Sequence, residues 1–113
     1  MELKDASTCL EALGNPKRLA IFRLLVSAGE DGLSFGTIQK ALDAAASTLN
    51  HHVSYLVRAG LVCQERKGRE VVSRCCFERM HTLVDFLTAE CCSGVCLHTL
   101  QPDDLSENVG DAA

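Results

Sequence analysis

Residues 46–76 constrain the fold more than any other part of the chain. From Ala46 to Ala59 the apolar side chains recur with helical spacing, and Gly60 follows where a left-handed cap would end a helix. Beyond this glycine, the pattern of residues 61–76 is typical of two short strands joined by a Lys67-Gly68 turn. A helix must therefore lead directly into a hairpin with a basic tip.

The preceding residues predict three further helices. One covers about residues 3–13, and a second begins at Asn15-Pro16, because asparagine can cap a helix and proline suits its first turn. Gly29 ends that helix, and Ser34 can cap a third, short one. The apolar residues expected on its inner face are Ile38, Ala41 and Leu42.

After the hairpin, the spacing of apolar residues predicts a last helix over about residues 78–91. The predicted fold class is therefore mainly α with one small β-hairpin. A length of 113 residues allows one domain, which we place at residues 1–100.

The charge of the chain is concentrated in its last residues. The net charge is −4, and residues 101–113 contain four acidic residues and no basic one, so residues 1–100 are neutral. Residues 101–113 are predicted to form an acidic, disordered tail. A protein that binds polyanions through overall basicity is excluded, but a local basic patch is not.

Membrane insertion is not expected. No stretch approaches the roughly 20 apolar residues that a membrane-spanning helix needs. The N-terminal residues 1–5 include charged side chains and show no signal-peptide pattern. We therefore expect a cytoplasmic protein that does not contact a membrane.

Polar residues of the helix and basic residues of the hairpin form a candidate DNA-binding surface. Two helices joined by a short turn and followed by a basic hairpin describe a winged helix-turn-helix, in which short polar side chains reach base edges and hairpin cations bind phosphates. The alternative is that these residues only solvate a surface helix. The candidate DNA-binding residues are Ser47, Thr48, Asn50, His51, Arg66, Lys67 and Arg69.

Several segments resemble the ArsR/SmtB family of metalloregulatory repressors. Leu13-Gly14-Asn15-Pro16-Lys17-Arg18-Leu19-Ala20-Ile21 resembles the opening motif of that family, and Ala46–Leu56 resembles its recognition helix. Arg58-Ala59-Gly60-Leu61-Val62 and Arg66-Lys67-Gly68-Arg69 extend the similarity into the wing. Asn50 stands where the family usually has serine, and it keeps a hydrogen-bond donor and acceptor at that position.

The resemblance implies a homodimer, joined through its N-terminal and C-terminal helices, that needs no cofactor while it represses. It would bind double-stranded operator DNA at an imperfect inverted repeat upstream of its own operon and leave when an inducer binds. Residues expected either at the dimer interface or in the core are Leu10, Leu83, Val84 and Leu87.

Three cysteines near the end of the last predicted helix form a candidate metalloid site. Cys91, Cys92 and Cys96 lie within six residues, and Ser93-Gly94 allows the chain to turn back between them. Thiolates select soft ions, and trivalent arsenic or antimony binds three thiolates in a pyramid. The alternative is that Cys91 and Cys92 pack as small apolar residues.

Two other sensor sites of the ArsR/SmtB family are absent from this chain. Residues 33–40 contain no cysteine, and the Asp/His pattern of the zinc sites is missing around His81 and Asp85. The remaining cluster resembles that of arsenic-responsive members, which implies release from DNA by arsenite, with antimonite as a further inducer. Two alternatives stay open for the same fold: it senses zinc, cadmium or lead through the three cysteines and His98, or it senses oxidants or sulfur species through its thiols.

The other four cysteines have weaker functional signals. With seven cysteines in a reducing compartment, we expect metal chemistry, redox chemistry or burial rather than structural disulfides. Cys9 is a candidate extra ligand or redox partner, and strand alternation directs Cys75 and Cys76 to opposite faces. Cys63 and Arg69 have the spacing of a phosphatase loop, but a hairpin lacks the required helix N-terminus, so we predict that the chain is not an enzyme.

Overall fold

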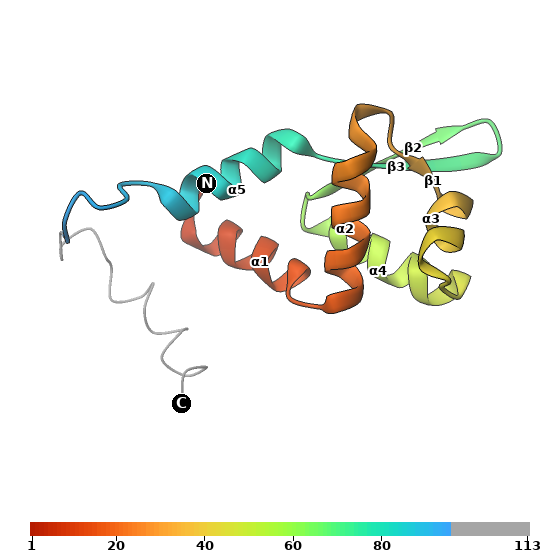
Figure 1. Ribbon diagram of the computed structural model, residues 1–113, viewed down its shortest axis with the longest axis horizontal. Helices are drawn as coiled ribbons and strands as arrows, with labels where there is room; N and C mark the ends of the chain where they lie inside the picture. The colour runs from red at the N-terminus through yellow and green to blue at the C-terminus, as the bar shows by residue number, and fades with distance from the viewer. Residues whose placement is uncertain (96–113) are drawn as a thin grey trace.

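The structure is a computed structural model that describes residues 1–95 (Figure 1). Within this range the elements follow in the order α1 (Leu3–Leu13), α2 (Pro16–Ala28), the 3₁₀ turn η1 (Gly29–Asp31), β1 (Leu33–Ser34), α3 (Phe35–Leu42), α4 (Ala46–Arg58), β2 (Val62–Lys67), β3 (Glu70–Cys75) and α5 (Phe77–Thr88). None of these helices is both long and apolar enough to cross a membrane. The predicted tail and the last five residues of the predicted domain lie outside the described residues.

The predicted helix starts are confirmed by the capping hydrogen bonds. The Asn15 side chain accepts from the backbone N–H groups of Lys17 (2.9 Å) and Arg18 (3.2 Å), and the Ser34 hydroxyl accepts from Thr37 N–H (3.2 Å). These bonds satisfy donors that the first helical turn leaves without a partner. The end of α4 is also as predicted, because Gly60 adopts a left-handed φ of 81°.

A third strand adds to the predicted hairpin. Strands β2 and β3 pair antiparallel from Val62–Cys75 to Lys67–Glu70, and β1 pairs with the other edge of β3. The strand order is thus β1-β3-β2, and it ties the start of α3 to the hairpin. A two-residue strand carries no periodic signal, so the sequence analysis missed it.

Two details of the predicted helices are wrong. The last helix ends at Thr88 rather than near residue 91, because Ala89 leaves the helical conformation with ψ of 132°. Ala41 is exposed rather than on an inner face, because the short helix α3 buries only Ile38 completely. The residue after α3, Asp43, is left-handed with φ of 49° and turns the chain toward α4.

The core lies between α2 and α4. The stripe of Leu49, Val53 and Leu56 is at most 1% exposed and belongs to the same buried cluster as Ile21 and Leu25 of α2. Figure 1 shows α1 and α5 side by side at one end of the molecule and α3 and the hairpin at the other, with α2 in the middle and α4 running from α3 toward the middle. Burial of the α4 stripe leaves its opposite, polar face exposed.

We expect Asn15→Ala to lower the free energy of unfolding by about 1 kcal/mol, because two N–H groups of α2 lose their cap. Chemical denaturation followed by circular dichroism measures this change. The matched control is Asn50→Ala on the exposed face of α4, which should change stability by less than about 0.5 kcal/mol. Equal losses in the two variants would contradict the capping role.

Candidate nucleic-acid interface and thiol cluster

A groove between α4 and the hairpin brings together three of the predicted DNA-binding residues. Its volume is about 720 Å³. Ser47 and Asn50 of α4 line this groove together with Arg69 of the Gly68-Arg69 hairpin turn. The remaining lining residues are Ser34, Phe35, Gly36, Ala46, Gln64, Glu70 and Val71. A helix face with hydrogen-bonding side chains and a cation therefore border one open cleft of the protein. Hydrogen-bonding groups of this kind read base edges of DNA, and cations of this kind bind its phosphates.

The other four predicted DNA-binding residues lie outside this groove. Arg66 and Lys67 are exposed at the end of β2, next to the hairpin turn. Thr48 lines a second cavity, of about 420 Å³, together with Lys17 and His52. His51 is exposed, and its ring centroid lies 5.7 Å from that of His52.

Two groups in the groove were missed by the sequence analysis. Ser34 caps α3 and Gly36 lies in its first turn, at the end of the helix where the dipole favours an anion. Gln64 lies on β2, and its amide nitrogen donates to the Ser73 hydroxyl (3.3 Å). Ser34 was predicted only as a cap, and no local pattern signals that α3 and β2 meet at one cleft.

His52 adds no positive charge to the interface at neutral pH. Burial lowers the pKa of His52, and the charges of Arg18, His51 and Lys17 lower it further. Its Nδ1 atom is buried without a hydrogen-bond partner in the described part of the chain. His51 is exposed, whereas His52 is partly buried.

The C-terminal half of α4 is held by the helices at the other end of the molecule. The Tyr55 hydroxyl donates to Glu11 of α1 (3.3 Å), and the Arg18 guanidinium lies 4.0 Å from the centre of the Tyr55 ring. A cation over an aromatic face is attracted by its quadrupole. These contacts connect the recognition helix to both α1 and α2.

The end of α4 has two further contacts. The buried Cys9 thiol of α1 donates to the Ala59 carbonyl (3.7 Å), so Cys9 is a core residue. Arg79 of α5 packs closely on Gly60. A Cβ atom added at Gly60 would lie 3.3 Å from the Arg79 Nε. Helices α1 and α5 therefore both reach the point where the recognition helix ends.

Cys91 and Cys92 form a close pair of thiols in the turn after α5. Their sulfur atoms are 3.4 Å apart, and both residues are exposed and free of disulfide bonds. Adjacent residues of a helix point about 100° apart. The convergence arises because α5 has already ended and because Glu90 and Cys92 adopt left-handed φ values of 59° and 62°.

The described residues supply no third donor for this thiol pair. No group of three or more His, Cys, Asp or Glu side chains with a metal-binding arrangement occurs within residues 1–95. The predicted third ligand, Cys96, and the alternative fourth ligand, His98, lie outside the described residues.

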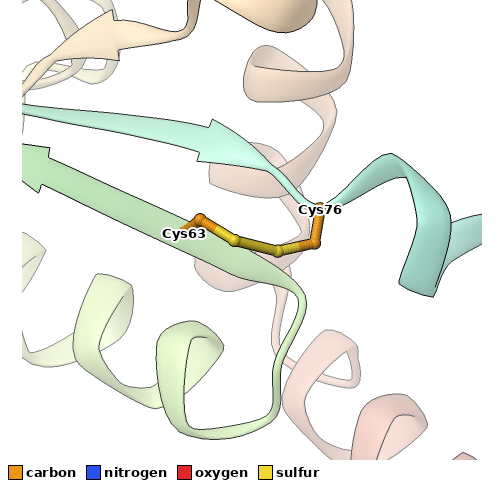
Figure 2. The surroundings of a disulfide bond; sticks show 2 residues. All are labelled: Cys63 and Cys76. Carbon is orange, nitrogen blue, oxygen red and sulfur yellow. A yellow bond between two sulfur atoms is a disulfide. The ribbon is translucent and has the colours of Figure 1, made fainter.

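Cys63 and Cys76 form a disulfide bond, which corrects the prediction that the cysteines are not structural staples (Figure 2). The two residues are 13 positions apart, and their Cα atoms are separated by 6.0 Å. The predicted alternation at the end of β3 is confirmed, because Cys75 is completely buried and Cys76 faces Cys63. A local pattern cannot reveal this pair, since the strand register brings the two residues together.

The exposed fractions of the apolar residues on α1 and α5 distinguish core residues from candidates for the dimer interface. Leu83 is only 4% exposed and belongs to the core. In contrast, Leu10, Val84 and Leu87 are 44%, 50% and 55% exposed. An apolar surface on two neighbouring helices is typical of a contact with another protein.

Comparison with known proteins places the fold among transcriptional regulators. Residues 13–65 match the family described as a helix-turn-helix domain. Among curated proteins, none matches the sequence of this chain. A transcriptional regulator homologue from Pyrococcus horikoshii OT3 is 31% identical, with a TM-score of 0.58, over 69% of this chain and 79% of that one.

Two further solved structures share the fold. One is the homodimeric winged helix-turn-helix DNA-binding domain of a possible ArsR-family regulator from Mycobacterium bovis, which is 26% identical with a TM-score of 0.62 and matches over 78% of this chain and 82% of that one. The other is an ArsR-like transcriptional regulator from Rhodococcus sp. RHA1, which is 21% identical with a TM-score of 0.66. The match covers 74% of this chain and 76% of that one. The predicted winged helix-turn-helix is thereby confirmed.

We expect Asn50→Ala and Arg69→Ala to weaken DNA binding in different ways. Loss of Asn50 should cost about 1–3 kcal/mol on the DNA upstream of the gene and little on unrelated DNA, because base contacts carry the specificity. Loss of Arg69 should weaken both complexes and reduce the salt dependence of binding by about one unit, as loss of a phosphate contact does. Fluorescence anisotropy at several salt concentrations measures both effects.

The control for these variants is Arg23→Ala, because Arg23 is exposed on α2 and does not line the groove. This variant should bind both DNA fragments like the unaltered protein. If Arg23→Ala weakens binding as much as Arg69→Ala does, the cations act through overall charge rather than through the groove.

Proposed function

Because the chain belongs to the winged helix-turn-helix transcriptional regulators, we propose that it is an ArsR-family repressor of the cytoplasm that trivalent arsenic releases from DNA. The inducer binds Cys91, Cys92 and Cys96. The observation that carries this proposal is the exposed thiol pair after α5, whose sulfur atoms lie 3.4 Å apart. Two thiols at this separation can bind one soft ion without rearrangement of the backbone.

The chemistry of the site favours a trivalent metalloid. Three thiols displace the three hydroxyl groups of arsenous acid, which forms three As–S bonds and releases three water molecules. Cys96, four residues after Cys92, supplies the third sulfur. Antimonite has the same valence and donor preference and is a second inducer. Zinc needs a fourth donor, for which His98 is the candidate.

The repressor is a homodimer whose subunits contact each other through α1 and α5. It binds its operator in this form. Leu10, Val84 and Leu87 supply an exposed apolar surface for the contact. The structurally similar domain from Mycobacterium bovis is a homodimer, which supports this assembly. Two-fold symmetry presents two recognition helices to successive grooves, so the operator is an imperfect inverted repeat.

The inducer acts at a distance, because α5, which the thiol pair follows, ends on the side of the molecule away from the hairpin (Figure 1). Helix α5 connects the end of β3 to the turn that carries the thiol pair. Its start contacts the end of α4 through Arg79 and through the Cys76 N–H, which donates to the Leu61 carbonyl (2.9 Å). A shift of α5 on arsenic binding therefore reorients α4 within the dimer. Such coupling amounts to about 1–3 kcal/mol in other regulators.

We expect Cys92→Ser to leave DNA binding intact and to abolish release by arsenite, because two sulfurs cannot replace three. Reduced protein is bound to a labelled fragment of its upstream DNA and titrated with arsenite and, separately, with zinc. Fluorescence anisotropy should show release of the unaltered protein by near-stoichiometric arsenite, with zinc inert. Cys91→Ser and Cys96→Ser should behave like Cys92→Ser.

The matched control is the double variant Cys63→Ser/Cys76→Ser, which removes two cysteines elsewhere and should still respond to arsenite. A Cys92→Ser protein that arsenite still releases would falsify the three-thiol site. Release of the unaltered protein by zinc alone would contradict the arsenic site and indicate a zinc site formed by the three cysteines and His98. Absence of DNA binding in every condition would overturn the repressor function.

A further inference from the structure

The Cys63–Cys76 disulfide joins the base of the wing to the start of α5 (Figure 2). Cys63 is the second residue of β2, and Cys76 directly precedes α5. The closed loop contains the whole wing, including the cations Arg66, Lys67 and Arg69. This bond therefore acts on the element that carries the predicted phosphate contacts.

The structure separates this pair from the cysteine next to it. Cys75 lies beside Cys76 in the sequence but is completely buried on the opposite face of β3. Burial, with a smaller contribution from Glu30, raises the pKa of the Cys75 thiol to about 11. Cys75 is therefore protonated and unreactive at neutral pH. Cys63 and Cys76 are only partly buried, so small reagents can reach them.

The disulfide restricts how the wing is oriented relative to the recognition helix. Without it, the hairpin is held by its strand pairing and by the Cys76 N–H bond to the Leu61 carbonyl. With it, the base of β2 cannot separate from the start of α5, so the wing whose Arg69 lines the groove with Asn50 has less freedom to move. A wing that is ordered before binding loses less conformational entropy on the DNA.

We propose that Cys63 and Cys76 form a thiol–disulfide exchange site that sets the DNA affinity through the wing. The co-reactant is a low-molecular-weight thiol and its disulfide. One protein thiolate attacks the small disulfide and releases one small thiol. The second protein thiolate then attacks the mixed disulfide and releases another. The protein loses two electrons and two protons, and both pass to the two small thiols. The oxidised protein binds DNA more tightly than the reduced protein.

The site is independent of the arsenic site, because it uses neither Cys91 nor Cys92. In a reducing compartment, stable structural disulfides are rare, and exposed ones respond to the thiol pool. The partial exposure of this pair is consistent with such exchange.

The test uses the full chain equilibrated in buffers of reduced and oxidised glutathione, without arsenite. Alkylation and mass spectrometry give the state of Cys63 and Cys76, and anisotropy gives the affinity for the upstream DNA. We expect the oxidised protein to bind about three- to tenfold more tightly, which is the scale of ordering a few side chains. Cys63→Ser/Cys76→Ser should bind with the lower affinity in every buffer. The matched control Cys91→Ser/Cys92→Ser should shift like the unaltered protein.

A second variant makes the test independent of whether the serine variants fold. Arg69→Ala retains both cysteines but loses the wing contact, so the difference between its oxidised and reduced forms should shrink. The proposal is overturned if both redox states of the unaltered protein bind DNA equally. It is also overturned if the folded protein cannot be reduced, or if the affinity shift persists without Cys63 and Cys76.

Discussion

Burial of one stripe of α4 determines which face of this helix borders the groove. Leu49, Val53 and Leu56 pack into the core with α2, and each buried leucine or valine contributes about 1.5–3 kcal/mol relative to an exposed one. Rotation of the helix would bury Ser47 and Asn50 and expose these residues. The apolar packing therefore orients the polar face toward the groove, and the strand order β1-β3-β2 places the start of α3 beside it.

The end of the same helix connects recognition to regulation. At Ala59 and Gly60 the recognition helix meets Cys9 of α1 and Arg79 of α5. These two helices also carry the exposed apolar residues proposed for the dimer contact. Under the proposed function, a shift of these two helices would reach α4 through packed side chains and a hydrogen bond. In a small rigid domain these direct contacts are enough to couple α1 and α5 to α4, because a close-packed core resists continuous deformation.

The cysteines show how environment decides the chemistry of one residue type. Cys9 and Cys75 are completely buried and behave as small apolar side chains. Cys63 and Cys76 are partly buried and bonded to each other, whereas Cys91 and Cys92 are exposed and close together. Among the cysteines of residues 1–95, only the exposed pair is accessible to an ion, and only the bonded pair links the base of the wing to the start of α5. The count of seven in the sequence does not distinguish these three classes.

The sequence by itself determined the features that depend on neighbouring residues. The caps at Asn15 and Ser34 and the helix end at Gly60 follow from local backbone preferences, and helical spacing identified the buried stripe of α4. The predicted Lys67-Gly68 turn is one residue too early, because Lys67 still pairs with Glu70 and the turn is Gly68-Arg69. Tertiary structure alone decided what depends on residues distant in the chain. Strand β1 exists because β3 offers it a free edge, and the Cys63–Cys76 bond exists because the register of β2 and β3 brings the two thiols together. The groove that contains Asn50 and Arg69 forms for the same reason, since its walls meet only when the helices and the sheet have packed.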